Sequence, residues 1–214
     1  CISVLGCYIN PVHPNPQARR DSLEWFKEHI RFARDFGCSI VATETGSLNA
    51  DCSYHPGNAS AETFEALVES VRELVGEAEK FGVFVCLEGV TTHTISTPQL
   101  MKRVLDRIQS NNLQVLFDLA NLLDENNIGR QREIIQEAFQ LYGDRIIMIH
   151  AKDFIFEHGI KKSVPIGKGL LDYPFLMKIL AAQKPGIEIT MEDTKPEWIE
   201  QGIKTLQCFL EPSG

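Results

Sequence analysis

The chain has 214 residues with 43% hydrophobic and 23% charged side chains, a composition typical of a globular protein with one large core. Its formal net charge of −8 repels a phosphate backbone, so we expect no nucleic-acid partner. No apolar run approaches the roughly 18 residues of a membrane span, and the six cysteines form no Cys-x-x-Cys pair, which together favour a cytoplasmic protein with free thiols and no membrane partner.

Short apolar runs of strand length alternate with amphipathic segments of helical spacing along the chain. The runs cover residues 2–9, 39–43, 83–87, 113–117, 146–149 and 187–191. The helical segments between and after them cover residues 21–36, 64–81, 131–142, 174–182 and 196–210. The first run begins at the very start of the chain, which suggests that an N-terminal piece precedes it.

Local signals define several helix ends. A capping box from Asp21 to Glu24 predicts the start of the first helix, and Gly37 and Gly82 predict the ends of the first and second. Thr97 followed by a proline predicts the start of a further helix. Residues 46–60 and 154–169 are predicted as loops, the second of them with a solvated turn at Lys161-Lys162.

This alternation predicts an α/β fold with a parallel sheet, because strands buried on both faces carry continuous apolar runs. A doubly wound open sheet competes with a barrel, but no glycine-rich phosphate loop follows any strand. No linker or second domain is visible, so residues 1–214 are predicted to form a single domain. Six strands are visible, where a closed barrel needs about eight.

Five consecutive strands end on a charged or metal-binding side chain. These residues are Glu44, Glu88, Asp118, His150 and Glu192. In a parallel barrel all such ends meet at one rim, where carboxylates repel one another unless a cation neutralises them. One imidazole with carboxylates suits Mn²⁺, Mg²⁺ or Co²⁺, with Zn²⁺ as a further option. A single acidic residue at a strand end is more often a helix cap, so the prediction depends on the repetition.

Four motifs resemble the sugar isomerase/epimerase superfamily of xylose-isomerase-like TIM barrels. They are Leu87-Glu88-Gly89, Phe117-Asp118-x-x-Asn121, His150-Ala151-Lys152-Asp153 and Met191-Glu192-Asp193. The resemblance implies a (β/α)8 barrel represented here by strands three to eight, without its first two βα units. It also implies one divalent metal ion held by Glu88, Asp118, His150 and Glu192.

The same resemblance implies an isomerase or epimerase that moves a proton at the carbon next to a ketone through an enediolate. Glu88 and Glu192 would be the acid/base pair. A small-molecule sugar or polyol ketone would be the substrate, and a homo-oligomer is compatible with it. The residues expected to bind the substrate are Glu44, His93, Asn121 and Lys152.

Simpler interpretations stand beside these roles. His93 is equally well a solvated loop histidine, and Glu44 a partner for a helix dipole. Lys152 and Asp153 fit either a role around the metal or a surface ion pair. Tyr8 and Asn10 are further candidate substrate contacts, although Asn10 before a proline also favours a turn.

Three other functions compete with an isomerase. An inosose- or dehydroshikimate-type dehydratase resembles the chain at the His150-x-Lys152-Asp153 motif and begins with the same proton abstraction. An endonuclease-IV-like repair enzyme shares the barrel but uses three zinc ions and extra histidines, and this chain has Asn121 where one of them is expected. A non-catalytic sugar-binding barrel is disfavoured by the intact set of four ligands.

Overall fold

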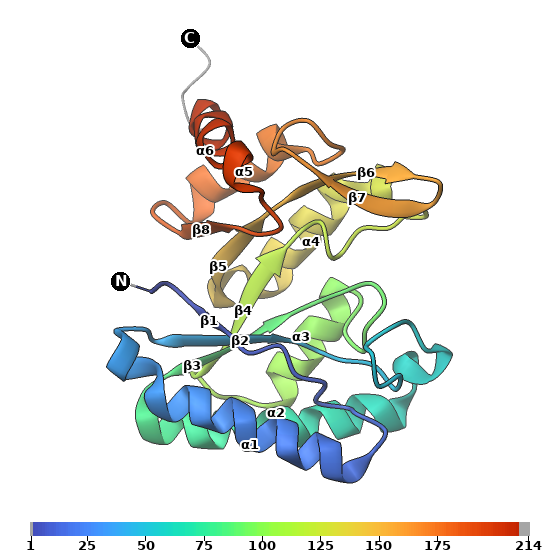
Figure 1. The fold of residues 1–214 in the computed structure, drawn as a ribbon, viewed down its shortest axis with the longest axis vertical. Helices are drawn as coiled ribbons and strands as arrows, with labels where there is room; N and C mark the ends of the chain where they lie inside the picture. The colour runs from blue at the N-terminus through green and yellow to red at the C-terminus, as the bar shows by residue number, and fades with distance from the viewer. Residues whose placement is uncertain (1, 210–214) are drawn as a thin grey trace. The chain divides into compact units, whose positions relative to one another are not determined.

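The computed structural model describes residues 2–209, and the chain divides into two compact units. Unit 1 is Cys1–Leu116 and unit 2 is Phe117–Gly214, so the division falls within strand β4 (Leu113–Asp118). Both units alternate strands with helices along the chain (Figure 1). Each of the six predicted strands is present, and apart from the first their ends lie within about two residues of the prediction, as is usual for element boundaries.

The strands of unit 1 are parallel and pair in chain order. They are β1 (Leu5–Gly6), β2 (Ile40–Glu44), β3 (Phe84–Glu88) and β4. Strands β2, β3 and β4 are buried along nearly their whole length, as expected for parallel strands that are covered on both faces. The register places Glu44 opposite Glu88, so both carboxylates stand at the carboxyl-terminal edge of this sheet.

Strand β1 is much shorter than the predicted run over residues 2–9. The chain continues beside β2, because the Cys7 N–H donates to the Ala42 carbonyl at 2.9 Å. The next N–H to reach β2, that of Ile9, donates at 3.1 Å to the side-chain oxygen Oγ1 of Thr43. A hydroxyl in place of a carbonyl ends the regular ladder there. Cys1 itself lies outside the described residues.

Two long helices and one shorter helix accompany the strands of unit 1. They are α1 (Pro16–Phe32), α2 (Ala61–Phe81) and α3 (Pro98–Arg107), with short 3₁₀ helices η1 (Ala33–Phe36) and η2 (Pro56–Ala59). The predicted end of the second helix is confirmed, since Gly82 caps α2 with a left-handed φ of 61°. The predicted end of the first helix is wrong, because α1 ends at Phe32, and Gly37 with a φ of 66° ends the 3₁₀ helix η1 that follows it. The predicted start at Thr97 is also confirmed, because its side chain accepts a hydrogen bond from the Leu100 N–H at 3.3 Å.

The predicted start of the first helix at Asp21 is wrong. Asn15 caps α1, and its Oδ1 accepts hydrogen bonds from the Gln17 and Ala18 N–H groups at 2.9 and 3.2 Å. Pro16 occupies the first turn, where its missing N–H costs nothing. Asp21 lies inside the helix and accepts a hydrogen bond from the Gln17 side chain instead.

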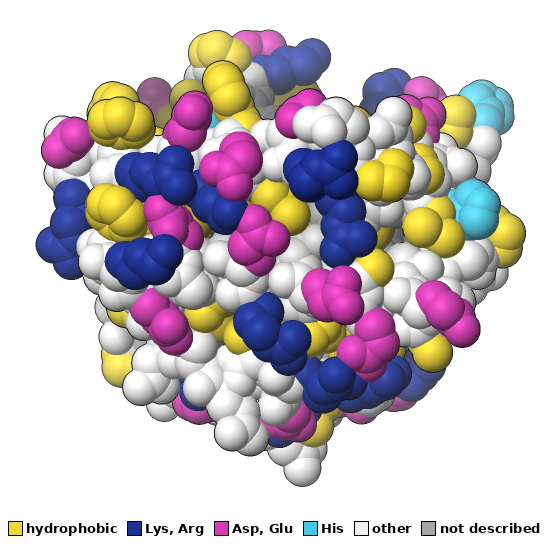
Figure 2. Space-filling view, turned by 90° about the horizontal axis from the view of Figure 1, so that it is seen from below, with side chains coloured by type: hydrophobic (Ala, Val, Ile, Leu, Met, Phe, Trp, Pro, Cys, Tyr) yellow, Lys and Arg dark blue, Asp and Glu magenta, His cyan; other side chains and the backbone are white. Residues whose placement is uncertain are grey.

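The helices α1 and α2 bury one face and present the other to solvent. Phe26 and Ile30 of α1 and Leu67, Val71 and Leu74 of α2 are completely buried. On the outer face of these helices, lysine and arginine side chains are interspersed with aspartate and glutamate, without a field of one sign (Figure 2). No helix in residues 2–209 is both long and apolar enough to span a membrane.

Unit 2 contains the remaining strands and helices. After the end of β4 come η3 (Ile128–Arg130), α4 (Gln131–Tyr142), η4 (Gly143–Arg145), β5 (Ile146–Ala151), β6 (Asp153–Glu157), β7 (Ile160–Val164), α5 (Tyr173–Gln183), β8 (Glu188–Met191), η5 (Pro196–Trp198) and α6 (Ile199–Cys208). Strands β5 and β8 are parallel, with His150 opposite Thr190. The closing helix was predicted over residues 196–210, and Leu210 lies outside the described residues.

The hairpin of β6 and β7 corrects the prediction of a loop over residues 154–169. Its two strands are antiparallel and join at a turn in which His158 and Gly159 have left-handed φ values of 52° and 79°. Lys161 and Lys162 lie in β7 and not in a solvated turn, and the Lys161 Nζ donates to the Ala120 carbonyl at 2.6 Å. The strand was missed because its residues are mostly polar and exposed, and so carry no apolar period.

Candidate active site

Three of the predicted metal ligands come together within unit 2. Asp118 is the last residue of β4, His150 lies in β5, and Glu192 directly follows β8. One candidate ligand atom of each lies within 4.8 Å of those of the other two. The His150 Nδ1 is 3.5 Å from Glu192 Oε2 and 4.0 Å from Asp118 Oδ2. Parallel strands bring these ends to one edge, as the sequence predicted.

Lys152 supplies a positive charge to this group. Its Nζ is 3.1 Å from Asp118 Oδ2 and also forms an ion pair with Glu192. The Lys152 side chain is only 14% exposed, so the interpretation of Lys152 as half of a surface ion pair is wrong. The strand placement explains this position, because Lys152 follows β5 two residues after His150.

The electrostatic environment differs between the two carboxylates. Burial raises the pKa of the Asp118 carboxyl, and the charge of Lys152 opposes that effect. Burial would also raise the pKa of Glu192, but hydrogen bonds and charges from His150 and Lys152 outweigh it and hold the pKa at about 2. Glu192 is therefore ionised over the whole physiological range.

Backbone contacts fix the positions of these side chains. The Asn121 N–H donates to Asp118 Oδ1 at 3.1 Å, so the backbone of this predicted substrate-binding residue orients a predicted metal ligand. The Glu192 N–H donates to the Ala151 carbonyl at 3.1 Å and extends the pairing of β8 with β5. The Tyr173 hydroxyl donates to the Lys152 carbonyl at 2.9 Å. Sequence reasoning missed this tyrosine, which follows no strand and belongs to no motif.

Asp153 has a role that neither sequence interpretation described. It is buried, and its carboxylate accepts hydrogen bonds from four backbone N–H groups at 2.9–3.3 Å. These donors belong to Phe154, Gly167, Gly169 and Leu171. A Cβ atom on Gly169 would lie 2.1 Å from Asp153 Oδ1, which explains why glycine occupies that position. Asp153 thus anchors the loop after the hairpin.

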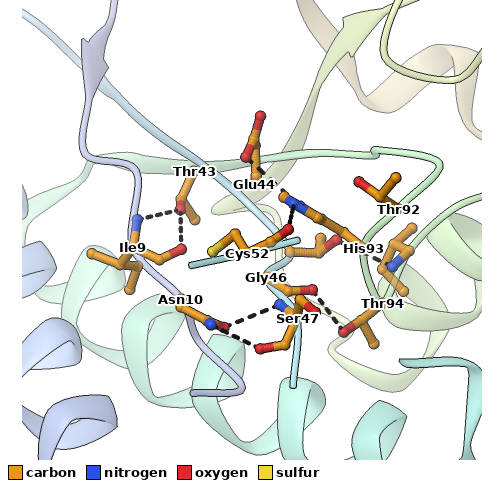
Figure 3. Close-up of polar contacts among 12 residues, drawn as sticks. Ile9, Asn10, Thr43, Glu44, Gly46, Ser47, Cys52, Thr92, His93 and Thr94 are labelled. Carbon is orange, nitrogen blue, oxygen red and sulfur yellow. Dashed lines mark hydrogen bonds and ion pairs between the residues drawn. The ribbon is translucent and has the colours of Figure 1, made fainter. Parts of the chain in front are cut away.

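The remaining predicted residues lie in unit 1. Glu88 ends β3 and is completely buried. Beside it in the register, Glu44 ends β2, and its Oε2 lies 3.7 Å from the Nδ1 of His93 (Figure 3). His93 is buried, so the interpretation as a solvated loop histidine is wrong.

His93 is held by a backbone carbonyl on its other side. Its Nε2 lies 3.1 Å from the Cys52 carbonyl oxygen, and a carbonyl only accepts, so Nε2 carries a proton (Figure 3). Burial lowers the pKa of His93, and the hydrogen bond to Cys52 opposes this effect. In the neutral ring Nδ1 is then an acceptor directed at Glu44. The role of Cys52 was missed because a backbone carbonyl leaves no signal in the sequence.

Asn10 organises the loop after β2. Its Nδ2 donates to the carbonyls of Ser47 and Asn49 at 2.7 and 3.0 Å, and its Oδ1 accepts from the N–H groups of Val12 and Ser47. All these partners are backbone groups of the protein itself, which favours the structural role for Asn10. Figure 3 shows Asn10 beside Ser47. Tyr8, by contrast, is 51% exposed.

Parallel strands that are each followed by a helix, with polar side chains at their carboxyl ends, define an α/β protein of the TIM-barrel class. Residues 1–209 match the family model of the xylose isomerase-like TIM barrel, and the chain belongs to this family. The resemblance inferred from the four motifs and the fold class are thereby confirmed. No curated protein matches the sequence.

Solved structures of low sequence identity share the fold. A D-tagatose 3-epimerase-like protein is 19% identical with a TM-score of 0.77, and the match covers 97% of this chain and 76% of that one. A probable 3-DHS dehydratase, AsbF of Bacillus anthracis, is 15% identical with a TM-score of 0.75, and the match covers 96% of this chain and 76% of that one. A xylose isomerase-like TIM barrel protein of Mycobacterium smegmatis in complex with magnesium is 18% identical with a TM-score of 0.72. The match covers 98% of this chain and 74% of that one.

Proposed function

We propose that this chain is a divalent-metal-dependent sugar isomerase or epimerase that moves a proton at the carbon next to a ketone. The observation that carries the proposal is the convergence of Asp118, His150 and Glu192 at the carboxyl ends of their strands. Family membership supports it, because epimerases and dehydratases are found among proteins of the same fold.

The three residues fit a metal ion. Two ligands of one ion, each about 2.0–2.2 Å from it, stand at most about 4.4 Å apart. The candidate ligand atoms lie within 4.8 Å of one another, so small side-chain movements suffice. Carboxylates with one imidazole favour Mn²⁺, Mg²⁺ or Co²⁺ over a metal that prefers thiolates. The low pKa of Glu192 suits a carboxylate that must stay ionised to hold a cation.

Glu88 is the fourth ligand in this proposal. It is a fully buried carboxylate at the end of β3. Strand β3 pairs with β4, which carries Asp118 at its own end. The proposal therefore treats the two units as parts of one barrel domain spanning residues 1–214.

The residues then divide the work of proton transfer. A divalent ion, when bound, would polarise the substrate carbonyl and acidify the adjacent C–H bond. Glu88 and Glu192 are the proposed acid/base pair, one removing the proton and the other returning it. Lys152, next to Glu192 and Asp118, is proposed to donate a hydrogen bond to a substrate oxygen.

Glu44, His93 and Asn121 are proposed to bind the rest of the substrate. The Nδ1 acceptor of neutral His93 and the carboxylate of Glu44 face each other at 3.7 Å, so both favour hydroxyl donors. A ligand with several hydroxyls suits this pair, whereas a carboxylate or phosphate would be repelled by Glu44. A neutral ketose is the substrate class that follows.

Solvent exchange tests the proposal. The chain is incubated with Mn²⁺ in D2O, separately with D-tagatose, D-fructose and 3-dehydroshikimate. We expect deuterium at the carbon next to the ketone together with an epimerised or isomerised sugar. Loss of water with a new ultraviolet-absorbing product, an aromatic catechol in the case of 3-dehydroshikimate, would instead establish the dehydratase alternative. If no compound exchanges while Mn²⁺ binding to His150→Ala equals that of the unchanged chain, both the site and the function are wrong.

A further inference from the structure

A hollow of 540 Å³ lies within unit 1, apart from the candidate metal ligands. Its walls come from the segments that follow β1 and β2 and from the second and third turns of α1. The residues that matter here are Tyr8, Asp21, Trp25, Asp51 and Cys52. Strand-end segments of this kind line substrate sites in parallel barrels, so the hollow is on the functional side of the sheet.

Two exposed aromatic rings border the hollow. Trp25 is 59% exposed and Tyr8 is 51% exposed, although Leu23 and Phe26 next to Trp25 on α1 are buried. His29 packs against the Trp25 ring at a tilted angle, with centroids 5.4 Å apart. Rings with an apolar face and a polar edge suit ligands that have both C–H faces and hydroxyls, as sugars do.

Acidic side chains accompany these rings. Asp51 Oδ1 accepts hydrogen bonds from the Ser53 N–H and hydroxyl at 3.0 and 2.7 Å, and these bonds lower the pKa of Asp51. The carboxylate is therefore ionised and fixed in position. Asp21 stands on the α1 side. The ten described residues that line the hollow include no lysine or arginine, so the hollow favours hydroxyl donors over anions.

The hollow adjoins the proposed substrate-binding pair through Cys52. The Cys52 carbonyl accepts the hydrogen bond from His93, whose other nitrogen faces Glu44 at 3.7 Å (Figure 3). Burial, followed by the charge of Glu44, raises the pKa of the Cys52 thiol, which is consistent with this proximity. A ligand held at Glu44 and extended toward Cys52 would reach the hollow.

We propose that this hollow is a binding subsite for a neutral sugar ring, stacked on Trp25 and Tyr8 and hydrogen-bonded to Asp51 and Asp21. It would accept the second ring of a glycoside whose keto-sugar ring binds at Glu44 and His93. The choice of a glycoside as substrate rests on the proposed function, whereas the affinity of the hollow for a sugar ring does not.

Calorimetry of the full chain with cellobiose and with maltose tests the subsite. We expect saturable binding of at least one disaccharide, weakened about tenfold or more by Trp25→Ala, since the stacking face of the sugar ring and the apolar area buried on it are both lost. Asp51→Asn should weaken binding as well, and Trp25→Phe should retain part of it. Phe32→Ala is the matched control, because Phe32 is 56% exposed on the same helix but does not line the hollow.

Two results would overturn the subsite. One is the absence of saturable heat with either disaccharide. If Trp25→Ala also changed the oligomeric state, the Trp25 ring would be assigned to contacts with a second copy. The other is an equal loss of affinity in Phe32→Ala. Deuterium exchange on a monosaccharide should be unchanged in Phe32→Ala. Because the exchange test uses a monosaccharide and the calorimetry uses disaccharides, failure of the one and failure of the other are separate outcomes.

Discussion

The two groups of polar side chains, one in each unit, are held in different ways. In unit 2, Asp118 and Glu192 share the positive charge of Lys152, and His150 lies 3.5 Å from Glu192. In unit 1, His93 is fixed by a backbone carbonyl and faces one carboxylate, Glu44. Charge compensation by Lys152 dominates the unit 2 group, whereas a backbone hydrogen bond holds the unit 1 histidine.

The different ways in which the two groups are held suggest different functions for them. A group of carboxylates around an imidazole and a lysine is suited to exchanging one cation for another, because the carboxylates need positive charge in every state. A histidine whose ring orientation is fixed by a carbonyl is suited to presenting an acceptor in a constant direction. We therefore propose that the unit 2 group mainly binds the metal and transfers the proton, and that the unit 1 pair recognises hydroxyls.

The largest effect is expected from Glu192→Gln. The amide oxygen can still coordinate a metal, but it cannot accept a proton, so turnover should fall by a factor of about 10²–10⁴. Deuterium exchange from D-tagatose in the presence of Mn²⁺ measures this. Glu188→Gln, at the exposed start of the same strand, is the control and should stay near the original rate. Equal losses in both variants would mean that Glu192 has no specific role in the reaction, and proton transfer could then not be assigned to the unit 2 group.

Lys152→Met tests the charge balance of unit 2. Removing the ammonium leaves Asp118 and Glu192 without their cation, and loss of one member of a buried ion pair costs about 3–5 kcal/mol. Urea unfolding in EDTA should show this loss, and Mn²⁺ should recover much of it by neutralising the same carboxylates. Lys178→Met, at an exposed position of α5, is the control. A deficit that Mn²⁺ does not reduce would argue against a metal site at these residues.

The sequence predicted the unit 2 group better than its surroundings. Asp118, His150 and Glu192 were found because buried parallel strands give recognisable runs, and the end of each run fixes one side chain at a known edge. Lys152 was recognised as a candidate, but its contact with two carboxylates depends on the pairing of β5 with β8, which are separated by a hairpin.

Other features left weaker or competing signals. The hairpin was missed because Lys161 and its neighbours in β7 are exposed and polar. The start of α1 was misplaced because Asp21 and Glu24 form a credible capping box, while Asn15 before Pro16 gives a second signal that the structure uses. The cap that is chosen depends on where the preceding strand delivers the chain, and local sequence does not contain that information.

Asp153→Asn is expected to have an intermediate effect, confined to unit 2. The carboxylate accepts hydrogen bonds from four backbone N–H groups, and hydrogen bonds to a charged acceptor contribute about 1.5–3 kcal/mol. We expect a loss of stability of about that size in urea unfolding, with faster hydrogen exchange at Gly167 and Gly169. Asp144→Asn, at an exposed aspartate, is the control. Unchanged exchange at both glycines would contradict the anchoring role.

The smallest effect concerns His93 and pH. Burial lowers the pKa of His93, so the folded state binds this proton less readily than the unfolded state, in which the pKa is about 6.5. The contribution of His93 to stability should therefore be complete above about pH 6.5 and should decline as the pH falls below that value. Urea unfolding of the unchanged chain and of His93→Gln between about pH 8 and 5 measures it, and the difference in stability between the two should shrink toward acid pH.

The control is His158→Asn, at the exposed left-handed position of the hairpin turn, and its stability should follow that of the unchanged chain across the same pH range. The opposite sign is the informative failure: if Glu44, 3.7 Å away, outweighed burial, protonated His93 would be favoured in the folded state and the difference would grow as the pH fell. That result would make the unit 1 pair an ion pair, and the recognition of neutral hydroxyls assigned to it would be lost.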